Sequence, residues 1–574
     1  MAPSTDVSTD LPYSEQSKLG RLKRRHSALK TERAAYDPAW KEAAENILPR
    51  RARFFTQDAN KGGKKESKIY NSKPTSASRT QASGMMASIS SPARKWMKIT
   101  TTLPELRELA PVKEWLDIVE ERVLAAFSKS NIYNCLHNVY ADIGTFGTSA
   151  MLVEEDPDTI VRAYVFPIGS YCLAQNAKGE VDTIFREFQM TSRQLVDMFG
   201  EENCSQSVRD DVNQGRLDKW NDVVLVIQPN GDYQPERIGA AGKEISTCWY
   251  EARTPDEGPD AKPLRESGYS ERPWMTPRWN VTGEDVWGTG PGTEALADAK
   301  MLQLLEKRKM QAFDKVVNPP MRAPTSLMGG RSSLLPGDVT YVDGSSPGQT
   351  FSPAMELNPM ALPAFRQEIR ECEMRIEDAY FASLWLTMQR IDAGKMTATE
   401  VTARQQEQML LLGPVMERLE DELLRPLVER VFAVLTRNRL IPPPPDELEG
   451  QELKIDYVSI MAQAQKLLGT ANIERFVTFV GHLHAVDQNA IDKLDLDQSI
   501  DEYGDAIGVP ARIIRSDDKV AAIRQARADA AAQQPQQVDA AAAVQGAKGL
   551  SETDTGQDNA LTRMLGNLSS PNVA

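Results

Sequence analysis

The chain has 574 residues, of which 41% are hydrophobic and 26% are charged, and its formal net charge is −14. This length suffices for several cores, but no apolar run approaches the roughly 18 residues of a membrane-spanning helix, so we expect no membrane partner. The acidic balance argues against a protein that grips nucleic acid over its whole surface, because phosphate contacts require Lys and Arg.

The N-terminal part, residues 1–149, shows helical patterns. We expect a basic amphipathic helix over residues 14–50 and further helices around 75–90 and 104–147. A basic cluster here either contacts nucleic acid or an acidic partner, or forms a solvated helix face, which is the more common case. Its members are Arg21, Lys23, Arg24, Arg25, Lys61, Lys64, Lys65 and Lys68.

Residues 150–290 change to short strands bounded by Gly, Asn, Pro and Asp, which predicts a mixed α+β part. A short helix is expected over residues 191–199. The expected strands are 151–153, 160–166, 184–188, 223–227 and 245–250.

The most informative segment is a helix, a Pro/Gly-rich insert and a second helix. The first helix is expected over residues 293–317 and ends before Pro319, because proline removes a donor and disfavours helix in the preceding residue. The insert covers 318–357. The second helix covers 358–385 and has Pro359 at its first position.

A connector over residues 386–396 leads to a third, long helix. Thr397 and Glu400 form a capping box, and the helix is expected to reach about residue 438. At ~1.5 Å per residue it would be roughly 60 Å long. Gly413 and Pro414 lie inside it, and the proline predicts a kink because it deletes a helical hydrogen bond.

Two stretches invite comparison with nucleotide-binding loops. Gly288, Gly290 and Gly292 precede the first helix, but Pro291 removes an amide that a phosphate cradle needs, so we predict a sharp turn instead. The stretch 394–397 lacks the upstream glycine and the leading strand of a Walker A loop. It belongs to the connector, which is a solvated loop or a functional one, and whose cations are Arg390 and Lys395.

No pattern of catalytic or metal-binding residues is present in the sequence. His482 and His484 are two residues apart on an expected helix and therefore face different directions. The five cysteines form no CxxC pair, which is typical of reduced thiols. We predict that the protein is not an enzyme and that it has no catalytic residues, no metal and no cofactor.

The C-terminal part begins with a stiff break at residues 442–445, four consecutive prolines. One strand is expected over 453–458, and helices are expected from 460 to about 514. The last residues, 516–574, are rich in Ala and Gln and lack aromatic side chains. Most of this tail cannot bury enough apolar surface to fold alone.

Several stretches, in their order and spacing, resemble the portal, or head-to-tail connecting, proteins of short-tailed (podovirus-type) bacteriophages. The resemblance covers about residues 15 to 500. Where similar proteins often carry an aromatic-glycine-basic-glycine run, this chain has Trp287-Gly288-Thr289-Gly290, so no role of a cation carries over. The stretches are 79–86 with 90–96, 142–148, 277–279 with 287–292, and 396–401.

The resemblance implies an α+β, mainly helical fold of the portal type, with wing, stem, clip and crown arranged in a ring of about twelve subunits. Each part then has a place in the chain. These places are 1–149 for the N-terminal helical part of the wing, 150–290 for the α+β wing, 291–317 for the descending stem helix, 318–357 for the clip, 358–385 for the ascending stem helix, 386–396 for the channel loop, 397–458 for the long kinked wing helix and return strand, 459–515 for the helical crown, and 516–574 for a tail that is largely disordered or ordered only in the ring.

The resemblance also implies what the ring does. Double-stranded DNA would pass through it at one capsid vertex during packaging and ejection, close to Arg390 and Lys395. A terminase and later tail adaptor proteins would dock on it, and the major capsid and scaffolding proteins would surround it. The protein would be made in the host cytoplasm and reside in the virion. The alternative is a tail adaptor or internal virion protein bound to a portal.

Overall fold

The structure is a computed structural model that describes residues 17–54, 67–107, 109–255, 262–317, 321–322, 352–353, 361–386, 412–448, 453–457, 475–480, 482–483, 494–507, 515 and 519–529. The chain divides into two units. The first comprises Met1–Thr102 and Ile118–Ala462, and the second comprises Leu103–Asp117 and Gln463–Ala574. The mixed α+β class expected from the sequence is confirmed.

An antiparallel five-stranded sheet, ordered β4-β5-β6-β7-β8, is formed by strands between residues 171 and 269 of the first unit. Its long central strands are β-branched and apolar, which suits a sheet buried on both faces. The strands are β4 (Tyr171–Gln175), β5 (Val181–Thr191), β6 (Trp220–Pro229), β7 (Ile245–Glu251) and β8 (Arg265–Tyr269). The sequence predicted β5, β6 and β7 and missed the two edge strands.

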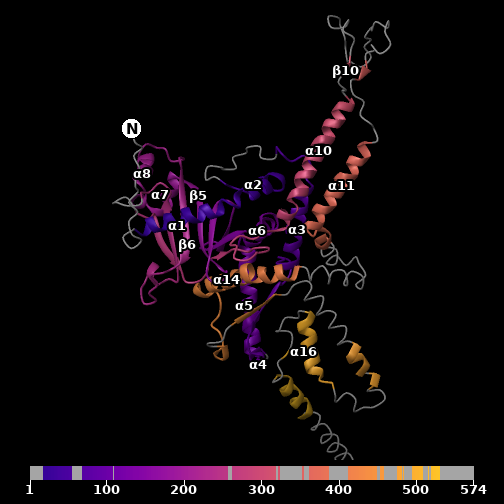
Figure 1. Ribbon diagram of the computed structural model, residues 1–574. Helices are drawn as coiled ribbons and strands as arrows, with labels where there is room; N and C mark the ends of the chain where they lie inside the picture. Colours follow the sequence, from indigo (N-terminus) through magenta and orange to yellow (C-terminus); the bar gives the residue numbers. More distant parts are fainter. Residues whose placement is uncertain are drawn as a thin grey trace, which may run out of the picture. The chain divides into compact units, whose positions relative to one another are not determined.

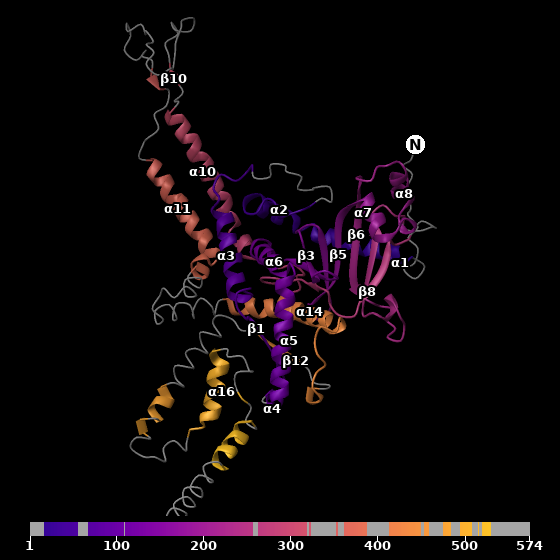
Figure 2. The ribbon, with the colours of Figure 1, turned by 180° about the vertical axis from the view of Figure 1, so that it is seen from behind.

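The side chains of β6 alternate between two cores. Leu225 and Ile227 belong to the main core of the unit, whereas Val224 and Val226 belong to a core on the opposite face. Helix α1 (Lys18–Arg33) covers that opposite face with Leu19 and other side chains (Figures 1 and 2). The short helices α7 (Ser192–Phe199) and α8 (Gln206–Asn213) form a third, smaller core beside β6. The expected helix over 191–199 is therefore confirmed, with Thr191 as its capping residue.

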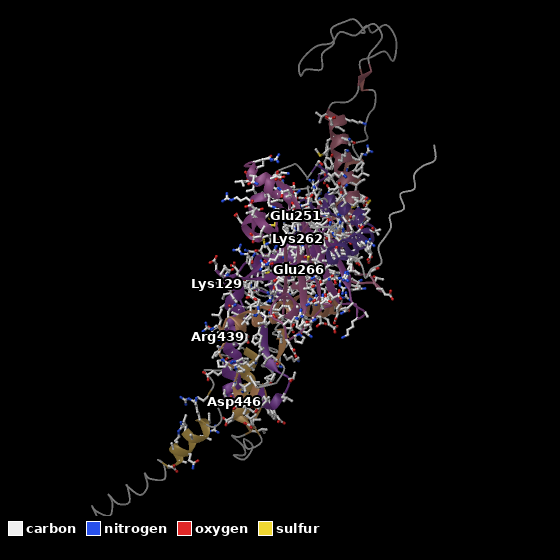
Figure 3. The ribbon with its side chains drawn as sticks, turned by 90° about the vertical axis from the view of Figure 1, so that its left-hand side faces the viewer. Lys129, Glu251, Lys262, Glu266, Arg439 and Asp446 are labelled. Carbon is white, nitrogen blue, oxygen red and sulfur yellow. The ribbon has the colours of Figure 1, made fainter. Side chains whose placement is uncertain are left out.

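The cations of α1 bind the sheet that the helix covers. Lys18 pairs with Glu266 of β8 at 3.0 Å, and Lys30 pairs with Glu187 of β5 at 2.7 Å. Glu266 is labelled in Figure 3. Arg25 donates to Thr183 at 3.1 Å. This helix is thus not fully solvated, and its contact with nucleic acid or an acidic partner stays a prediction. Lys61, Lys64 and Lys65 of the basic cluster lie outside the described residues.

A second sheet, ordered β3-β2-β9, contains β2 (Ala150–Asp156), β3 (Ile160–Phe166) and β9 (Trp274–Met275). Helices α2 (Asp37–Asn46), α3 (Lys73–Ile89) and α6 (Ile132–Phe146) lie around the main core. The single helix predicted over residues 14–50 is wrong, because a turn at residues 34–36 separates α1 from α2, whose first turn contains Pro38.

A two-stranded antiparallel ribbon joins distant parts of the first unit. Strand β1 (Met97–Thr101) pairs with β12 (Leu453–Tyr457), and Ile99 faces Ile455. Strand β12 was expected, but the sequence predicted only helices before residue 150, so β1 corrects it. Strand β1 has five residues and its partner lies more than 350 positions away, so no neighbouring hairpin turn in the sequence indicates a strand here.

Two long helices of the first unit lie side by side in both views (Figures 1 and 2). They are α10 (Leu296–Val317), preceded by the short α9 (Pro291–Glu294), and α11 (Ala361–Ala379). We call α10 and α11 the helix pair. The second helix was predicted to run to residue 385 without a break, but it is interrupted at Tyr380 and Phe381, after which residues 382–386 are helical again.

The long third helix is described from residue 412 onward and is not uniform. Residues 412–419 are α-helical, Glu420–Leu424 form a π-helical turn, and α14 (Arg425–Arg437) follows. Pro426 explains the π-helical turn, because it has no N–H to make the i→i−4 bond of a regular α-helix. The predicted end near residue 438 is confirmed.

The remaining elements are short or belong to the second unit. Strands β10 (Met321–Arg322) and β11 (Ser352–Pro353) pair with each other in the first unit. The second unit contains α4 (Pro104–Arg107), the start of α5 (Ala110–Lys129) and α16 (Leu496–Ile507). Among the described residues, none of the helices has the length and apolar character that crossing a bilayer requires.

His26 makes the docking of α1 sensitive to pH. Its ring stacks on Phe185 at 5.1 Å, and burial lowers its pKa to about 4, despite the opposing effect of Glu187. The unfolded chain binds this proton near pH 6.5 and the folded chain does not, so stability falls as the pH drops from 6.5 towards 4.

We therefore expect the free energy of unfolding to fall by about 2 kcal/mol more between pH 7 and pH 5 in the parent protein than in His26→Phe. Phenylalanine preserves the stack on Phe185 and removes the titrating group. Urea unfolding curves at both pH values measure the difference. Equal losses in the two proteins would show that His26 is not the source.

Candidate functional site at the base of the helix pair

The base of the helix pair rests on the C-terminal end of α6 through direct backbone contact. Gly147 ends α6 with a φ of 79°, and a Cβ there would lie 2.3 Å from the Gly288 carbonyl oxygen. Cβ atoms at Gly290 and Gly292 would lie 2.5 Å and 2.3 Å from carbonyl oxygens of α6. The Gly288 N–H donates to Thr148 Oγ1 at 2.8 Å. We call this contact the glycine junction.

Aromatic side chains surround the glycine junction. Trp287, which is 2% exposed, packs edge-on against Trp40 at 4.7 Å and contacts Tyr36 and Tyr171. Trp40 Nε1 donates to the carbonyl oxygen of Phe146 at 3.2 Å. These rings hold α2 against the end of α6, so the junction is enclosed by rigid groups.

Helix α3 closes another side of the junction. Ser78 Oγ and Thr145 Oγ1 lie 3.0 Å apart, and the Gln81 side chain contacts Gly144 so closely that no Cβ would fit there. Gly84 receives the Trp385 ring, since a Cβ at Gly84 would lie 2.4 Å from Trp385 Cβ. Gly144 thus allows α3 to approach α6, and Gly84 allows the segment after α11 to approach α3.

A polar clamp fixes both members of the helix pair to the start of α3. The Gln303 side chain of α10 accepts from the Asn71 N–H at 2.9 Å and donates to the Asn71 carbonyl at 2.8 Å. Asn71 Nδ2 in turn donates to Glu306 of α10 at 3.1 Å and to Glu373 of α11 at 2.9 Å. One asparagine therefore binds both helices.

A buried arginine joins the loop before the junction to the π-helical turn. Arg278, 5% exposed, binds Glu422 through Nε at 3.0 Å, while its backbone N–H donates to the other carboxylate oxygen at 2.9 Å. It also donates to the Gly179 carbonyl at 2.9 Å. The neighbouring Trp279 donates its N–H to the Gly147 carbonyl and so belongs to the same junction.

The buried tyrosine and cysteine near the helix pair stay uncharged at neutral pH. Burial raises the pKa of the Tyr380 hydroxyl and that of the Cys372 thiol. Neither group is poised to act as a base or nucleophile. Among the described residues, no group of three His, Cys, Asp or Glu side chains could hold a metal ion. The arrangement supports a mechanical role, in which the junction determines where the helix pair stands.

The residues singled out in the sequence lie in three places. The glycines 288, 290 and 292 are in the junction. Gly413 and Pro414 are exposed near the start of the described helix 412–419, and the kink there stays a prediction because residues 401–411 lie outside the described part. Also outside the described residues are Arg390, Lys395, Thr397 and Glu400.

The contacts of Asn71, Gly84 and the Arg278–Glu422 pair were not predicted from the sequence, although Gly84 and Arg278 lie in stretches that carried the resemblance. Gly84 also carried a local signal, since a glycine inside a helix often marks close packing. The partners in the other two cases are 144 or more positions apart along the chain, so local patterns could not reveal them.

Comparison with known proteins agrees with this architecture. The model of the family described as bacteriophage head to tail connecting protein matches residues 19–514. The chain belongs to this family. It is 42% identical over 552 residues to the portal protein of Salmonella phage epsilon15, and the match covers 96% of this chain and 98% of the relative. It is 38% identical over 551 residues to the probable portal protein of Bordetella phage BPP-1, with the same coverage.

The family and these relatives together show that this chain has the role of a portal protein, a component of the virion. Most of the stretches that carried the resemblance in the sequence meet in space at the glycine junction. Helix α3 supplies 79–86, the end of α6 supplies 142–148, and the loops before α9 supply 277–279 and 287–292. The stretch 396–401 lies outside the described residues.

Replacing Gly147 by alanine tests the close backbone contact in the glycine junction. We expect Gly147→Ala to lower the free energy of unfolding by about 1–3 kcal/mol more than Gly215→Ala does. Both glycines have a positive φ, 79° and 73°, but nothing lies within 4 Å of a Cβ at Gly215. The control therefore measures the backbone cost alone. Equal losses in urea unfolding would show that the Gly288 carbonyl does not crowd Gly147.

Proposed function

We propose that the chain forms a closed ring of about twelve identical subunits at one vertex of the capsid, and that double-stranded DNA passes through its centre. The observation that carries this proposal is the helix pair. Its base is fixed by the glycine junction and the Asn71 clamp, yet it exposes large apolar side chains that the core of the subunit does not cover. These are Met301, Leu304, Met310, Phe313, Val316, Val317 and Met374, between 36% and 73% exposed.

Exposed apolar groups of this number call for a partner surface. A neighbouring copy satisfies them in a heterologous ring, in which each subunit offers two different faces and closure requires a fixed rotation. On α10, Met301 and Leu304 lie on a different side from Met310 and Phe313, in agreement with two distinct contact faces. The helix pair then corresponds to the stem.

The other parts take the places implied by the family. Residues 1–149 and 150–290 form the wing, 318–357 the clip, 459–515 the crown, and 397–458 the wing helix with its return strand. Residues 386–396 are the channel loop, near the DNA. The clip binds the terminase during packaging and tail adaptor proteins afterwards, and capsid and scaffolding proteins surround the ring after synthesis in the host cytoplasm.

This function is mechanical and requires no catalytic group of the chain itself. A separate ATPase would drive the DNA inward, and the ring would guide it, hold it and release it at infection. The net charge of −14 suits such a conduit, because an acidic wall repels phosphate and lowers the chance of a tight, stalling contact.

Native mass spectrometry of the purified protein, with negative-stain images of the same sample, tests the ring. We expect closed particles of about a dozen copies in the parent protein and only smaller species in Leu304→Asp, because a buried leucine contributes about 1.5–3 kcal/mol and every interface loses it. Leu217→Asp, the same change at an exposed leucine outside the helix pair, should leave the ring intact. A parent protein that stays monomeric or dimeric at high concentration would favour a tail adaptor.

The double substitution Arg390→Ala, Lys395→Ala tests the channel loop. We expect altered DNA packaging, retention or ejection of complemented phage particles with rings of normal size, because two cations near the DNA would be lost. Arg193→Ala with Lys178→Ala removes two exposed cations from the α+β part and serves as the control. Unchanged packaging, retention and ejection in the first variant would remove the support for a DNA contact in the loop.

A further inference from the structure

Two irregular backbone segments meet at the dipeptide Arg278-Trp279. The first follows α11, where Phe381 has a φ of 53°, a conformation that a bulky aromatic residue rarely adopts. The Phe381 ring stacks on Trp279 with 6.4 Å between centroids and 29° between planes. The second segment is the helix over 412–419 with its π-helical turn, and it attaches to the same dipeptide from another direction.

Two contacts make this second attachment. Arg418 donates from its guanidinium to the Trp279 carbonyl oxygen at 3.0 Å. Glu422, inside the π-helical turn, accepts from the side chain and the backbone N–H of Arg278. Both partners of this pair are shielded, since their side chains are 6% and 17% exposed, so the interaction is stronger than a surface ion pair.

The same turn contains an ion pair of the ordinary surface kind. Asp421 and Arg425 lie 2.9 Å apart with side chains 55% and 54% exposed. Asp421 is thus a matched control for Glu422. It has the same charge and lies in the same π-helical turn, but its ion pair is with Arg425, whereas Glu422 binds Arg278.

The segment after α11 is held by packing rather than by its own backbone preference. Phe381 occupies a strained conformation, and Trp385 Nε1 is buried without a hydrogen-bond partner. Two contacts compensate, one with Trp279 and the other with the surface of α3 at Gly84. Loss of the Trp279 contact would therefore favour release of residues 381–386.

We propose that Arg278-Trp279 is a coupling element, which holds residues 380–386 and the helix 412–424 in mutually dependent conformations. A change in one segment is then transmitted to the other through this dipeptide. These are the described segments on either side of residues 387–411. In the proposed ring, on which this assignment rests, the coupling joins the stem to the helix that follows the channel loop.

Hydrogen exchange with mass spectrometry on the full-length protein tests the coupling with Glu422→Gln. We expect peptides that contain residues 420–426 to exchange about tenfold faster or more, because a charged hydrogen-bonded partner is lost. Peptides that contain 381–386 should also exchange faster, although the hydrogen bonds of Glu422 go to Arg278. Asp421→Asn should leave both sets within about twofold of the parent, and unchanged exchange in β5–β7 would show that the fold is intact.

A second variant makes the result independent of the folding of the first. Arg418→Met removes the bond to the Trp279 carbonyl and leaves the Arg278–Glu422 pair in place. It should again speed exchange in 381–386. Parent-like exchange of 381–386 in Arg418→Met and in any folded Glu422→Gln, or equal effects of Asp421→Asn, would overturn the coupling. The measurement uses no DNA or partner, so such a result leaves the proposed ring untouched.

Discussion

The close backbone contact between the end of α6 and the segment Gly288–Gly292 is the constraint on which the rest of the helix pair depends. No side chain lies between the two backbones, because Cβ atoms at the glycines would collide with carbonyl oxygens. Helix α10 begins four residues after this contact, so the position of the end of α6 determines the direction in which α10 leaves the junction. In the proposed ring, the helix pair would need such a rigid base in order to repeat identically in every subunit.

Three buried arginines join distant parts of the first unit. Arg33, Arg278 and Arg430 are between 1% and 5% exposed, and each binds groups from distant parts of the chain. Arg430, for instance, donates to the Val153 carbonyl at 3.2 Å and pairs with Glu271. Buried carboxylates such as Asp142 and Asp211 accompany these arginines, whose bonds join segments that are far apart in the chain.

The sequence was most informative where a local rule decides the structure. Thr191 and Gln194 form a capping box at α7, and the strands β5, β6 and β7 show as apolar, β-branched runs. It failed where a distant partner decides, as for β1, or where an irregularity interrupts a good helical pattern, as at Phe381 and Glu420–Leu424. Helical periodicity measures which face is apolar and does not register a single strained residue.

The sequence by itself determined the α+β class, the order of the long helices, the absence of familiar catalytic and metal-binding motifs, and the resemblance to the family. Short-range propensity and the succession of motifs suffice for these. Only the tertiary structure brought the stretches of that resemblance together at one junction and gave Arg278 the partner Glu422, 144 positions away. Such pairings depend on backbone approaches of a few ångströms, which the hydrophobic pattern along a chain does not encode.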